Sequence, residues 1–311
     1  MADLILHHYP LSPFAEKIRL ILGRKGLSWR SVQIPVIMPK PDLVALTGGY
    51  RRTPVLQIGA DVYCDTALMA DVLEHLAPEP ALFPPAQKGL ARVLAQWADT
   101  TLFQVAMAYN FQPAGATSLF PDPEKLKVFG ADRAAMRNNA PRMPAADATA
   151  AYKSYLRRIA SMLEHQPFLL GDQPGIADFS VYHPLWFTRH QVPVLASILE
   201  SVPAVLLWMD RMAAIGQGSA SAMTAAEAIK IAHDAAPEPL PEEAHQDFHG
   251  IALGEPAIIA AESFGLEPTE GILVAASRTR YTLRRQDPRA GEVHVHFPRV
   301  GFSLKAKESI S

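Results

Sequence analysis

Four prolines within a short stretch divide this chain into two parts of different character. Pro78, Pro80, Pro84 and Pro85 cannot continue a helix or donate a backbone hydrogen bond, so they mark a linker. Before this linker, short β-prone and helical runs alternate, whereas after it helical periodicity continues to about Gly216. A chain of 311 residues exceeds one typical domain of about 100 to 200 residues, so at least two cooperating units are predicted.

The part before the linker has the predicted order βαβαββα. We expect strands at residues 4–9, 28–35, 54–58 and 61–64, and helices at residues 13–26, 41–47 and 65–76. Two parallel strands flanking a helix, followed by a hairpin around Gly59-Ala60 and a packing helix, make one small sheet covered by helices. Residues 1–78 are therefore predicted to form an α/β domain, called here the sheet domain.

The part after the linker is predicted to contain three segments. Residues 87–216 form an all-α domain, called here the helical domain, with helices at 87–109, 122–136, 146–164, 176–190 and 201–214. Residues 217–244 hold a short helix at 225–233 and a second linker rich in Pro and Glu. Residues 245–311, called here the C-terminal extension, are predicted to form a small antiparallel sheet from β-prone runs at 257–262, 272–277, 280–286, 292–297 and 300–304.

Composition excludes several classes of function. The formal net charge of -2 gives no general attraction to nucleic acid or to anionic lipid. Apolar runs are far shorter than the roughly 20 residues of a membrane-spanning helix, and the N-terminus lacks a secretory signal. The single cysteine, Cys64, cannot form an internal disulfide, and we expect it to be buried and structural. A cytoplasmic protein with no nucleic-acid or membrane partner is expected.

The segment Tyr9-Pro10-Leu11-Ser12-Pro13-Phe14 places a hydroxyl between the first strand and the first helix. The free N–H groups and the dipole of a helix N-terminus favour an anion there. A serine hydroxyl at this point can donate a hydrogen bond to a substrate thiolate and lower the pKa of the thiol from about 8.5. The alternative interpretation is that Ser12 serves only as the N-cap of the helix.

Two further motifs lie at the starts of other elements. In Arg52-Thr53-Pro54-Val55 a proline precedes a strand, and a cis peptide bond would leave the N–H and C=O of Thr53 free to pair with an extended peptide; a trans bond is the usual alternative. Asp65-Thr66 opens the helix after the hairpin, where a carboxylate and a hydroxyl can hold the ammonium and carboxylate of an amino acid or act only as a helix cap.

Together these motifs, in this order and spacing, resemble those of the cytosolic glutathione transferases. The resemblance covers about residues 3–216 and implies a thioredoxin-like domain followed by an all-α domain, the glutathione transferase fold, commonly as a homodimer. The run from Gly171 to Asp178 is similar to the family's buried capping box. It departs from the family pattern at Gly175, which lacks the usual side-chain acceptor three residues before Asp178.

The resemblance implies a role for each matching residue. Ser12 is expected to contact the glutathione sulfur, Thr53 to pair with the cysteinyl backbone before a cis-proline, and Arg52 to meet the glycyl carboxylate. Asp65 and Thr66 are expected to hold the γ-glutamyl end. The full set of glutathione-binding residues predicted in this way is Ser12, Phe14, Arg52, Thr53, Pro54, Asp65 and Thr66.

The sequence around Ser12 is most similar to that of the branch related to the omega class, whose members usually have cysteine at this position. Serine cannot attack a mixed disulfide as a thiolate does, so conjugation is expected rather than thiol-disulfide exchange. Tyr9 is the rival sulfur-activating hydroxyl, since other classes use a tyrosine there. Tyr109 and Phe111 are predicted to wall the site of a small apolar electrophile.

Three functions therefore remain open. The leading one is a glutathione transferase that activates the thiol of glutathione as a thiolate. The alternatives are a non-catalytic protein that uses the C-terminal extension for binding, and a glutathione-dependent dehalogenase or isomerase. No metal is expected, because the pairs His245 with His249 and His294 with His296 each have no evident third ligand.

Overall fold

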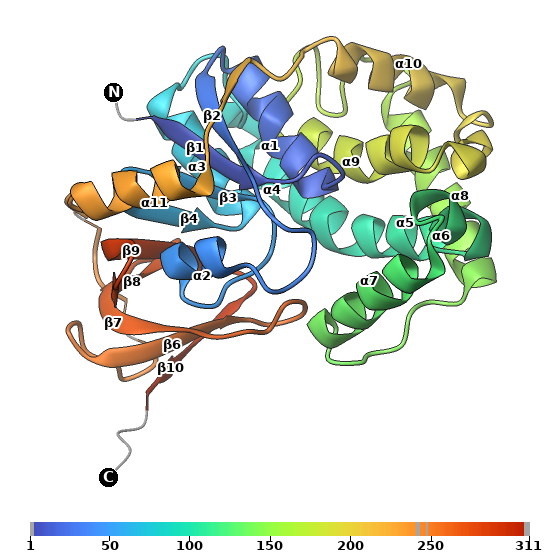
Figure 1. Cartoon of the computed structure of the whole chain (residues 1–311). Helices are drawn as coiled ribbons and strands as arrows, with labels where there is room; N and C mark the ends of the chain where they lie inside the picture. Colours follow the sequence, from blue (N-terminus) through green and yellow to red (C-terminus); the bar gives the residue numbers. More distant parts are fainter. Residues whose placement is uncertain (1–2, 241–242, 247, 308–311) are drawn as a thin grey trace.

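The computed structural model describes residues 3–240, 243–246 and 248–307 (Figure 1). The sheet domain has the predicted order: its elements are β1 (Leu4–His8), α1 (Pro13–Arg24), β2 (Ser28–Gln33), α2 (Pro41–Thr47), β3 (Val55–Ile58), β4 (Asp61–Cys64) and α3 (Thr66–Leu76). β1 pairs in parallel with β2 and antiparallel with β3, which forms a hairpin with β4. The expected thioredoxin-like arrangement is confirmed.

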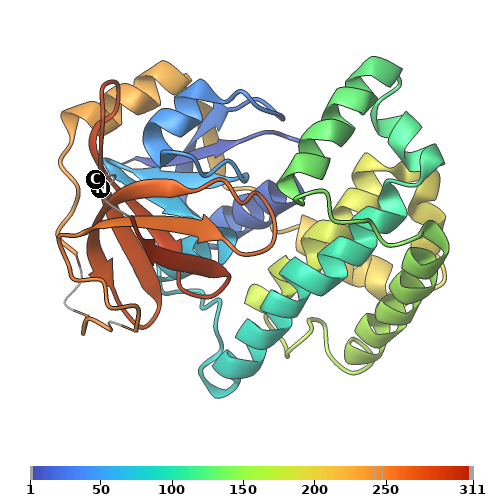
Figure 2. The ribbon, with the colours of Figure 1, turned by 90° about the horizontal axis from the view of Figure 1, so that it is seen from below.

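The helical domain contains the predicted helices, one additional α-helix and one additional 3-10 helix, η4 (Pro193–Leu199). Its α-helices are α4 (Lys88–Trp97), α5 (Phe103–Asn110), α6 (Pro113–Leu119), α7 (Pro123–Met136), α8 (Ala145–Met162), α9 (Ile176–Trp186) and α10 (Pro203–Ala213). The short turn η1 (Pro85–Gln87) precedes α4, and the π-helical turns η2 (Ala98–Leu102) and η3 (Phe187–Gln191) follow α4 and α9. The additional α-helix is α6, whose sequence PAGATSL has too few large apolar residues to show helical periodicity. Seen from below, this domain stands beside the sheet (Figure 2).

The start of α9 explains the unusual glycine of the capping box. The Asp178 carboxylate accepts hydrogen bonds from the backbone N–H of Gly175 at 3.0 Å, from that of Leu169 at 2.9 Å and from the Trp208 indole at 2.9 Å. A Cβ atom at Gly175 would lie 3.0 Å from the carbonyl oxygen of Leu82. Glycine therefore permits the close approach of the linker to α9, while Asp178 still stabilises the turn.

The C-terminal extension forms the five predicted strands, namely β6 (Pro256–Ala261), β7 (Thr269–Ala276), β8 (Arg280–Asp287), β9 (Gly291–Pro298) and β10 (Phe302–Ala306). These strands are antiparallel to one another, but β9 also pairs in parallel with β4, with Asp61 opposite His294. At the other end, β5 (Ser219–Ala222) pairs in parallel with β2. The result is one ten-stranded sheet of order β10-β6-β7-β8-β9-β4-β3-β1-β2-β5, not a separate small sheet.

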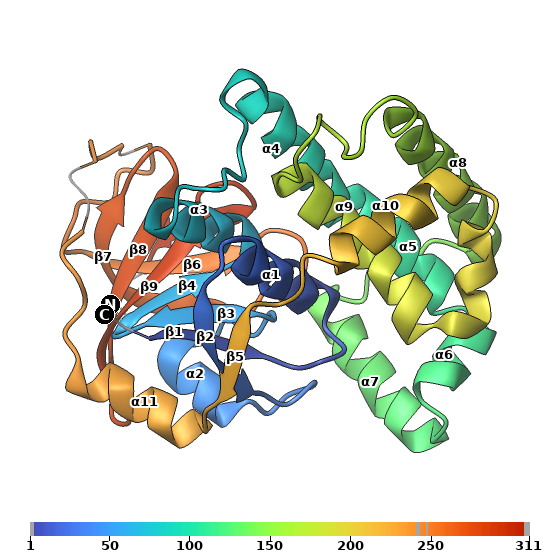
Figure 3. The ribbon, with the colours of Figure 1, turned by 90° about the horizontal axis from the view of Figure 1, so that it is seen from above.

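The sheet is covered on both faces. In the view from above, α1 and α3 lie on one side of it, and α2 and α11 (Ala225–Asp234) lie on the other (Figure 3). One buried apolar cluster combines Val55 and Val62 of the sheet domain with Ile229 of α11 and with Val293 and Val295 of β9. The extension therefore shares a hydrophobic core with the sheet domain. Within the described residues, no helix is long and apolar enough to cross a membrane.

Candidate functional site

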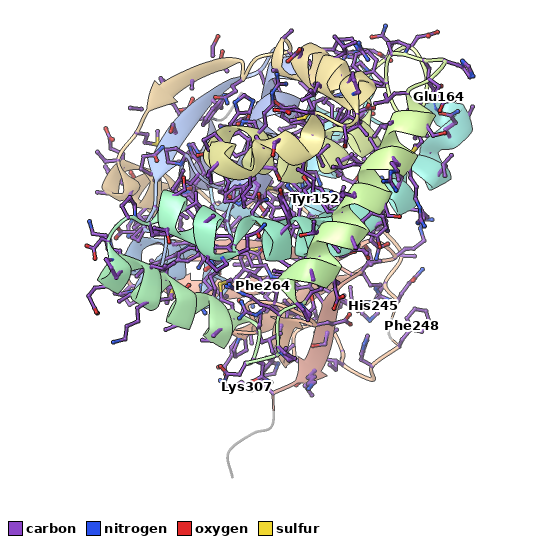
Figure 4. All side chains as sticks on the ribbon, turned by 90° about the vertical axis from the view of Figure 1, so that its right-hand side faces the viewer. Tyr152, Glu164, His245, Phe248, Phe264 and Lys307 are labelled. Atoms are coloured by element: carbon purple, nitrogen blue, oxygen red, sulfur yellow. The ribbon has the colours of Figure 1, made fainter. Side chains whose placement is uncertain are left out.

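A cavity of about 670 Å³ lies where the sheet domain, the helical domain and the C-terminal extension meet. Every residue of the predicted glutathione-binding set lines this cavity, as do Tyr9 and Phe111. The extension contributes the segment around Phe264, where the backbone N–H of Gly265 donates to the carbonyl oxygen of Met136 in α7 at 2.7 Å. Phe264 is labelled in Figure 4. Three separate motifs of the sequence thus converge on one cavity.

Ser12 is both the N-cap of the first helix and a wall residue of the cavity. It is the N-cap of α1, where its hydroxyl oxygen accepts a hydrogen bond from the backbone N–H of Ala15 at 3.2 Å, and it also lines the cavity. The residue is 2% exposed. Because the hydroxyl oxygen accepts in the cap, its proton remains available for donation to an acceptor.

Tyr9 is held by the helical domain. Its hydroxyl accepts a hydrogen bond from Arg133 of α7 at 3.2 Å, and Arg133 also donates to the carbonyl oxygen of Val36 at 3.1 Å. Burial raises the pKa of the Tyr9 hydroxyl, although Arg133 and Ser12 act in the opposite direction. The phenol therefore stays protonated at neutral pH and can donate a hydrogen bond.

Thr53 precedes a cis peptide bond to Pro54, one of the two isomers considered from the sequence. Lys40, at the start of α2, donates to the Thr53 hydroxyl and to the carbonyl oxygen of Arg51, both at 3.2 Å. Burial lowers the pKa of the Lys40 ammonium to about 8. Lys40 was not predicted from the sequence, in which a lysine between two prolines gives no periodic signal.

Asp65 and Thr66 begin α3 beside a basic residue. The Asp65 carboxylate accepts from the backbone N–H of Ala67 at 2.9 Å and lies 3.7 Å from the Arg52 guanidinium. Asp65 has a φ of +74°, a conformation that costs free energy in an L-residue and that is concentrated at functional sites. The Thr66 hydroxyl accepts from Lys17 at 3.2 Å. Asp65 is therefore the N-cap of α3, and both residues line the cavity.

A buried ionic network that the sequence did not indicate lies under this part of the cavity. Lys17 of α1 is fully buried, and its ammonium is 2.6 Å from the Asp99 carboxylate in η2. Asp99 also lies 3.0 Å from the Nε2 atom of His183 in α9. Burial by itself raises the pKa of the Asp99 carboxyl, but Lys17 and His183 outweigh burial and the pKa is lowered. The network joins the two domains and places one carboxylate at the cavity wall.

The extension contacts the site directly. The Nε atom of Arg52 donates to the carbonyl oxygen of Phe264 at 2.5 Å, and the guanidinium carbon lies 5.5 Å from the centre of the Phe302 ring. The neighbouring Arg51 pairs with Asp132 of α7 at 2.7 Å and with Glu267 of the extension at 2.6 Å. These two arginines therefore tie the sheet domain to both other parts of the chain.

The two predicted wall residues differ in position. Phe111 lines the cavity and stacks on Phe129 and Phe187, with ring centres 5.6 and 6.1 Å away. Tyr109 does not line it: its hydroxyl donates to the carbonyl oxygen of Leu195 at 2.9 Å and its ring packs on Tyr152 inside the helical domain. The prediction for Tyr109 is corrected, because its face of α5 points into the core.

The structure also shows the surroundings of Cys64 and of the pair His294 and His296. Cys64 is fully buried, and burial raises the pKa of its thiol well above the usual value, as the structural interpretation requires. The pair His294 and His296 does have a neighbouring third group, the Asp61 carboxylate, which lies 2.8 Å from Nε2 of His296 and 3.8 Å from Nδ1 of His294. The parallel pairing of β4 with β9 brings Asp61 there, and no sequence pattern revealed that pairing.

Comparisons with known proteins identify the family of both domains. Residues 6–81 match the model of the glutathione S-transferase N-terminal domain, and residues 135–211 match that of the C-terminal domain. A crystal structure of a GST-like protein from Pseudomonas syringae is 46% identical, covers 99% of this chain and 100% of its own, and has a TM-score of 0.83.

Two more distant proteins are similar over part of the chain. The FtsZ-localized protein A of Caulobacter vibrioides is 26% identical over 180 residues, which is 56% of this chain and 72% of that protein. A tau class glutathione S-transferase from mango, Mangifera indica, is 15% identical with a TM-score of 0.51 and covers 68% of this chain and 89% of its own. The latter likeness concerns the fold alone.

Proposed function

Since the chain belongs to the glutathione transferase family, we propose that the cavity binds glutathione and that Ser12 stabilises its thiolate for attack on an electrophile. The observation that carries this proposal is the convergence of three separate motifs on one cavity, represented by Ser12, Thr53 and Thr66. Two of these residues stand at the N-termini of α1 and α3. The thiolate and the γ-glutamyl end of the peptide would therefore each face the partial positive charge of a helix N-terminus.

The chain's own residues account for each part of glutathione. The Ser12 hydroxyl and the N-terminus of α1 would receive the sulfur, and the backbone of Thr53 would pair with the cysteinyl residue. Asp65 and Thr66 would hold the γ-glutamyl ammonium and carboxylate. Because Arg52 lies beside Asp65, we assign its guanidinium to the γ-glutamyl carboxylate instead of the glycyl carboxylate, which we assign to Lys40.

The proposed reaction is nucleophilic displacement or addition. The thiol loses its proton to solvent, the sulfur forms a bond to the electrophilic carbon, and any leaving group departs with its bonding electrons. A hydrogen bond from Ser12 to the thiolate lowers the thiol pKa and increases the reactive fraction at neutral pH. Tyr9 is the rival donor, because its protonated hydroxyl is in the same part of the cavity.

Calorimetric titration with glutathione and a panel of electrophiles test this proposal. We expect binding at millimolar glutathione or below, and consumption of glutathione with at least one apolar electrophile. Ser12→Ala is expected to lower turnover by about tenfold to a hundredfold, the order of effect of one hydrogen bond to an ionised group. No heat of binding, or turnover unchanged in Ser12→Ala, would contradict the proposal.

A non-catalytic binding protein is the second candidate. It is favoured by the similarity to the FtsZ-localized protein A and by the small exposure of Ser12, 2%. Glutathione binding without turnover of any electrophile in the panel would support it. A glutathione-dependent dehalogenase or isomerase would share the same pocket and is distinguished by regeneration of glutathione.

We also propose a homodimer in a reducing, cytoplasmic compartment. The edge of β4 is occupied by β9, so a second copy cannot pair with that strand. Leu90 and Val93 of α4 are 55% and 66% exposed and offer an apolar face for a second copy. Sedimentation equilibrium tests this: Leu90→Glu with Val93→Glu should yield monomers, and a wild-type protein that is monomeric at micromolar concentration would contradict it.

A further inference from the structure

We infer that the second substrate carries an anionic group next to an aromatic body, and that Arg137 and Arg142 bind that group. This inference rests on the proposed function, because it concerns the part of the cavity that glutathione would leave free. The small apolar electrophile expected from the sequence is thereby replaced by an aromatic electrophile that carries a negative charge. An aromatic carboxylate that bears a leaving group is the simplest member of that class.

The first observation is the charge of the cavity wall. Eight lysine and arginine side chains line the cavity, against two carboxylates, Asp65 and Asp99. The whole chain has a formal net charge of -2, so this excess of positive charge is local. A cavity lined by one sign of charge raises the local concentration of ligands of the opposite sign.

The second observation is that five of the eight cations already have a carboxylate partner within ion-pair distance. The other three are Lys40, Arg137 and Arg142, for which no carboxylate partner is found in the described part of the chain. Lys40 contacts Thr53 and belongs to the proposed glutathione site. Arg137 and Arg142 therefore remain for another ligand.

The third observation is the position of these two arginines. Arg137 follows the end of α7, where its Nε atom donates to the carbonyl oxygen of Ala140 at 3.3 Å. The guanidinium carbon of Arg142 lies 5.5 Å from the centre of the Phe111 ring, which is part of the aromatic wall. Burial lowers the pKa of Arg137, and burial together with the charge of Arg137 lowers the pKa of Arg142.

Two neighbouring guanidinium groups beside stacked aromatic rings suit a ligand that combines an aromatic ring with an anionic group. An aromatic ring of the substrate would pack on Phe111 and Phe129, and a carboxylate on that ring would accept charge-assisted hydrogen bonds from the arginines. With a chloride as the leaving group, the glutathione sulfur bonds to the ring carbon that carries the chlorine, and chloride leaves with the electron pair of the broken bond. The remote carboxylate is unchanged and serves only for binding.

The test compares two unreactive ligands of similar shape, one anionic and one neutral. The affinities of 3,5-dinitrobenzoate and of 3,5-dinitrobenzamide are measured by calorimetry on the full-length protein saturated with glutathione. We expect the benzoate to bind about tenfold more tightly. In the double variant Arg137→Met with Arg142→Met this preference should disappear, while the affinity for glutathione is unchanged. Arg157→Met, an exposed arginine of α8 outside the cavity, is the control and should keep the preference.

Kinetics give an independent readout with 4-chloro-3,5-dinitrobenzoate and its benzamide. The benzoate should have about tenfold lower KM than the benzamide, and the double variant should lose that difference. Equal affinity of the wild type for both unreactive ligands, or a preference that survives in the double variant, would overturn the inference even if glutathione binds. Absence of glutathione binding itself would instead overturn the proposed function.

Discussion

The Nε atom of Arg52 donates a hydrogen bond to the backbone carbonyl oxygen of Phe264 at 2.5 Å. This bond joins a residue of the proposed glutathione site to a loop of the C-terminal extension, 212 positions later in the chain. Phe302 packs against the same guanidinium. The extension therefore supports the site and does not form an independent appendage.

Phe302→Ala should weaken both the fold and the site. Phe302 is 3% exposed, and its ring centre lies 5.5 Å from that of Phe297. We expect a loss of about 3 to 5 kcal/mol in the free energy of unfolding and a lower glutathione affinity, because Arg52 loses support. Phe248→Ala is the control, since Phe248 is 75% exposed and should change stability by about 0.5 kcal/mol at most. Glutathione affinity equal to wild type in a folded Phe302→Ala protein would contradict this account.

Truncation after residue 216 should prevent stable folding. It removes β9, which covers the edge of β4, and the apolar side chains of Ile229, Val293 and Val295 that fill the core beneath the sheet. An uncovered edge strand and an incomplete core favour aggregation. We expect insoluble protein, or protein without a cooperative thermal transition. A soluble truncated chain with wild-type glutathione affinity would show that the extension is dispensable.

Lys17→Met should destabilise the contact between the domains. The substitution leaves the Asp99 carboxylate without its cation in a mostly buried position, which costs about 3 kcal/mol. The double variant Lys17→Met with Asp99→Leu should recover part of this loss, because it removes the uncompensated charge. Urea denaturation of the two variants measures the difference. A double variant less stable than Lys17→Met would show that the charge of Asp99 is compensated by other groups.

The stability of the fold should fall as pH is lowered from about 6.5 to about 4. Burial lowers the pKa of His7 and of His8 from 6.5 to about 4, with Arg19 adding to the effect at His8. In this range the unfolded chain binds protons that the folded chain excludes, so the free energy of unfolding decreases. The lowered pKa of His7 alone accounts for about 3 kcal/mol of this decrease in the free energy of unfolding.

The variant His7→Gln separates this residue from other groups that titrate in the same range. Its free energy of unfolding should decrease less than that of the wild type between pH 7 and pH 4. Urea denaturation at each pH gives both curves. Parallel curves for the two proteins would contradict the assignment to His7.

The candidate glutathione site was predictable because its residues lie at the ends of local elements. Ser12 and Asp65 begin helices and Thr53 precedes a strand, so their places follow from short patterns and from the order of elements. Lys40, Lys17 and the network around Asp99 were not predictable. Their partners lie on other elements, and a buried lysine has the same local sequence signal as an exposed one.

Three features of the structure differ from the sequence-based predictions or were missed by them: the orientation of Tyr109, the strand β5 and the pairing of β9 with β4. The π-helical turn η2 lies between α4 and α5, and its extra residue rotates the faces of α5 relative to a continuous helix. Tyr109, predicted as a wall residue of the electrophile site, faces the core instead, where its hydroxyl donates to the carbonyl oxygen of Leu195. β5 has four exposed residues, Ser219 to Ala222, and thus no alternation of apolar side chains. The pairing of β9 with β4 joins residues more than 200 positions apart, which no local pattern encodes.

The most direct test of the central claim is the pKa of the thiol of bound glutathione. It is measured from the ultraviolet absorbance of the thiolate as a function of pH, in the wild type, in Ser12→Ala and in Tyr9→Phe. We predict a pKa clearly below the free-thiol value of about 8.5 in the wild type and in Tyr9→Phe, and a return towards that value in Ser12→Ala. A wild-type pKa equal to that of free glutathione, or one lowered equally in Ser12→Ala, would contradict the role assigned to Ser12.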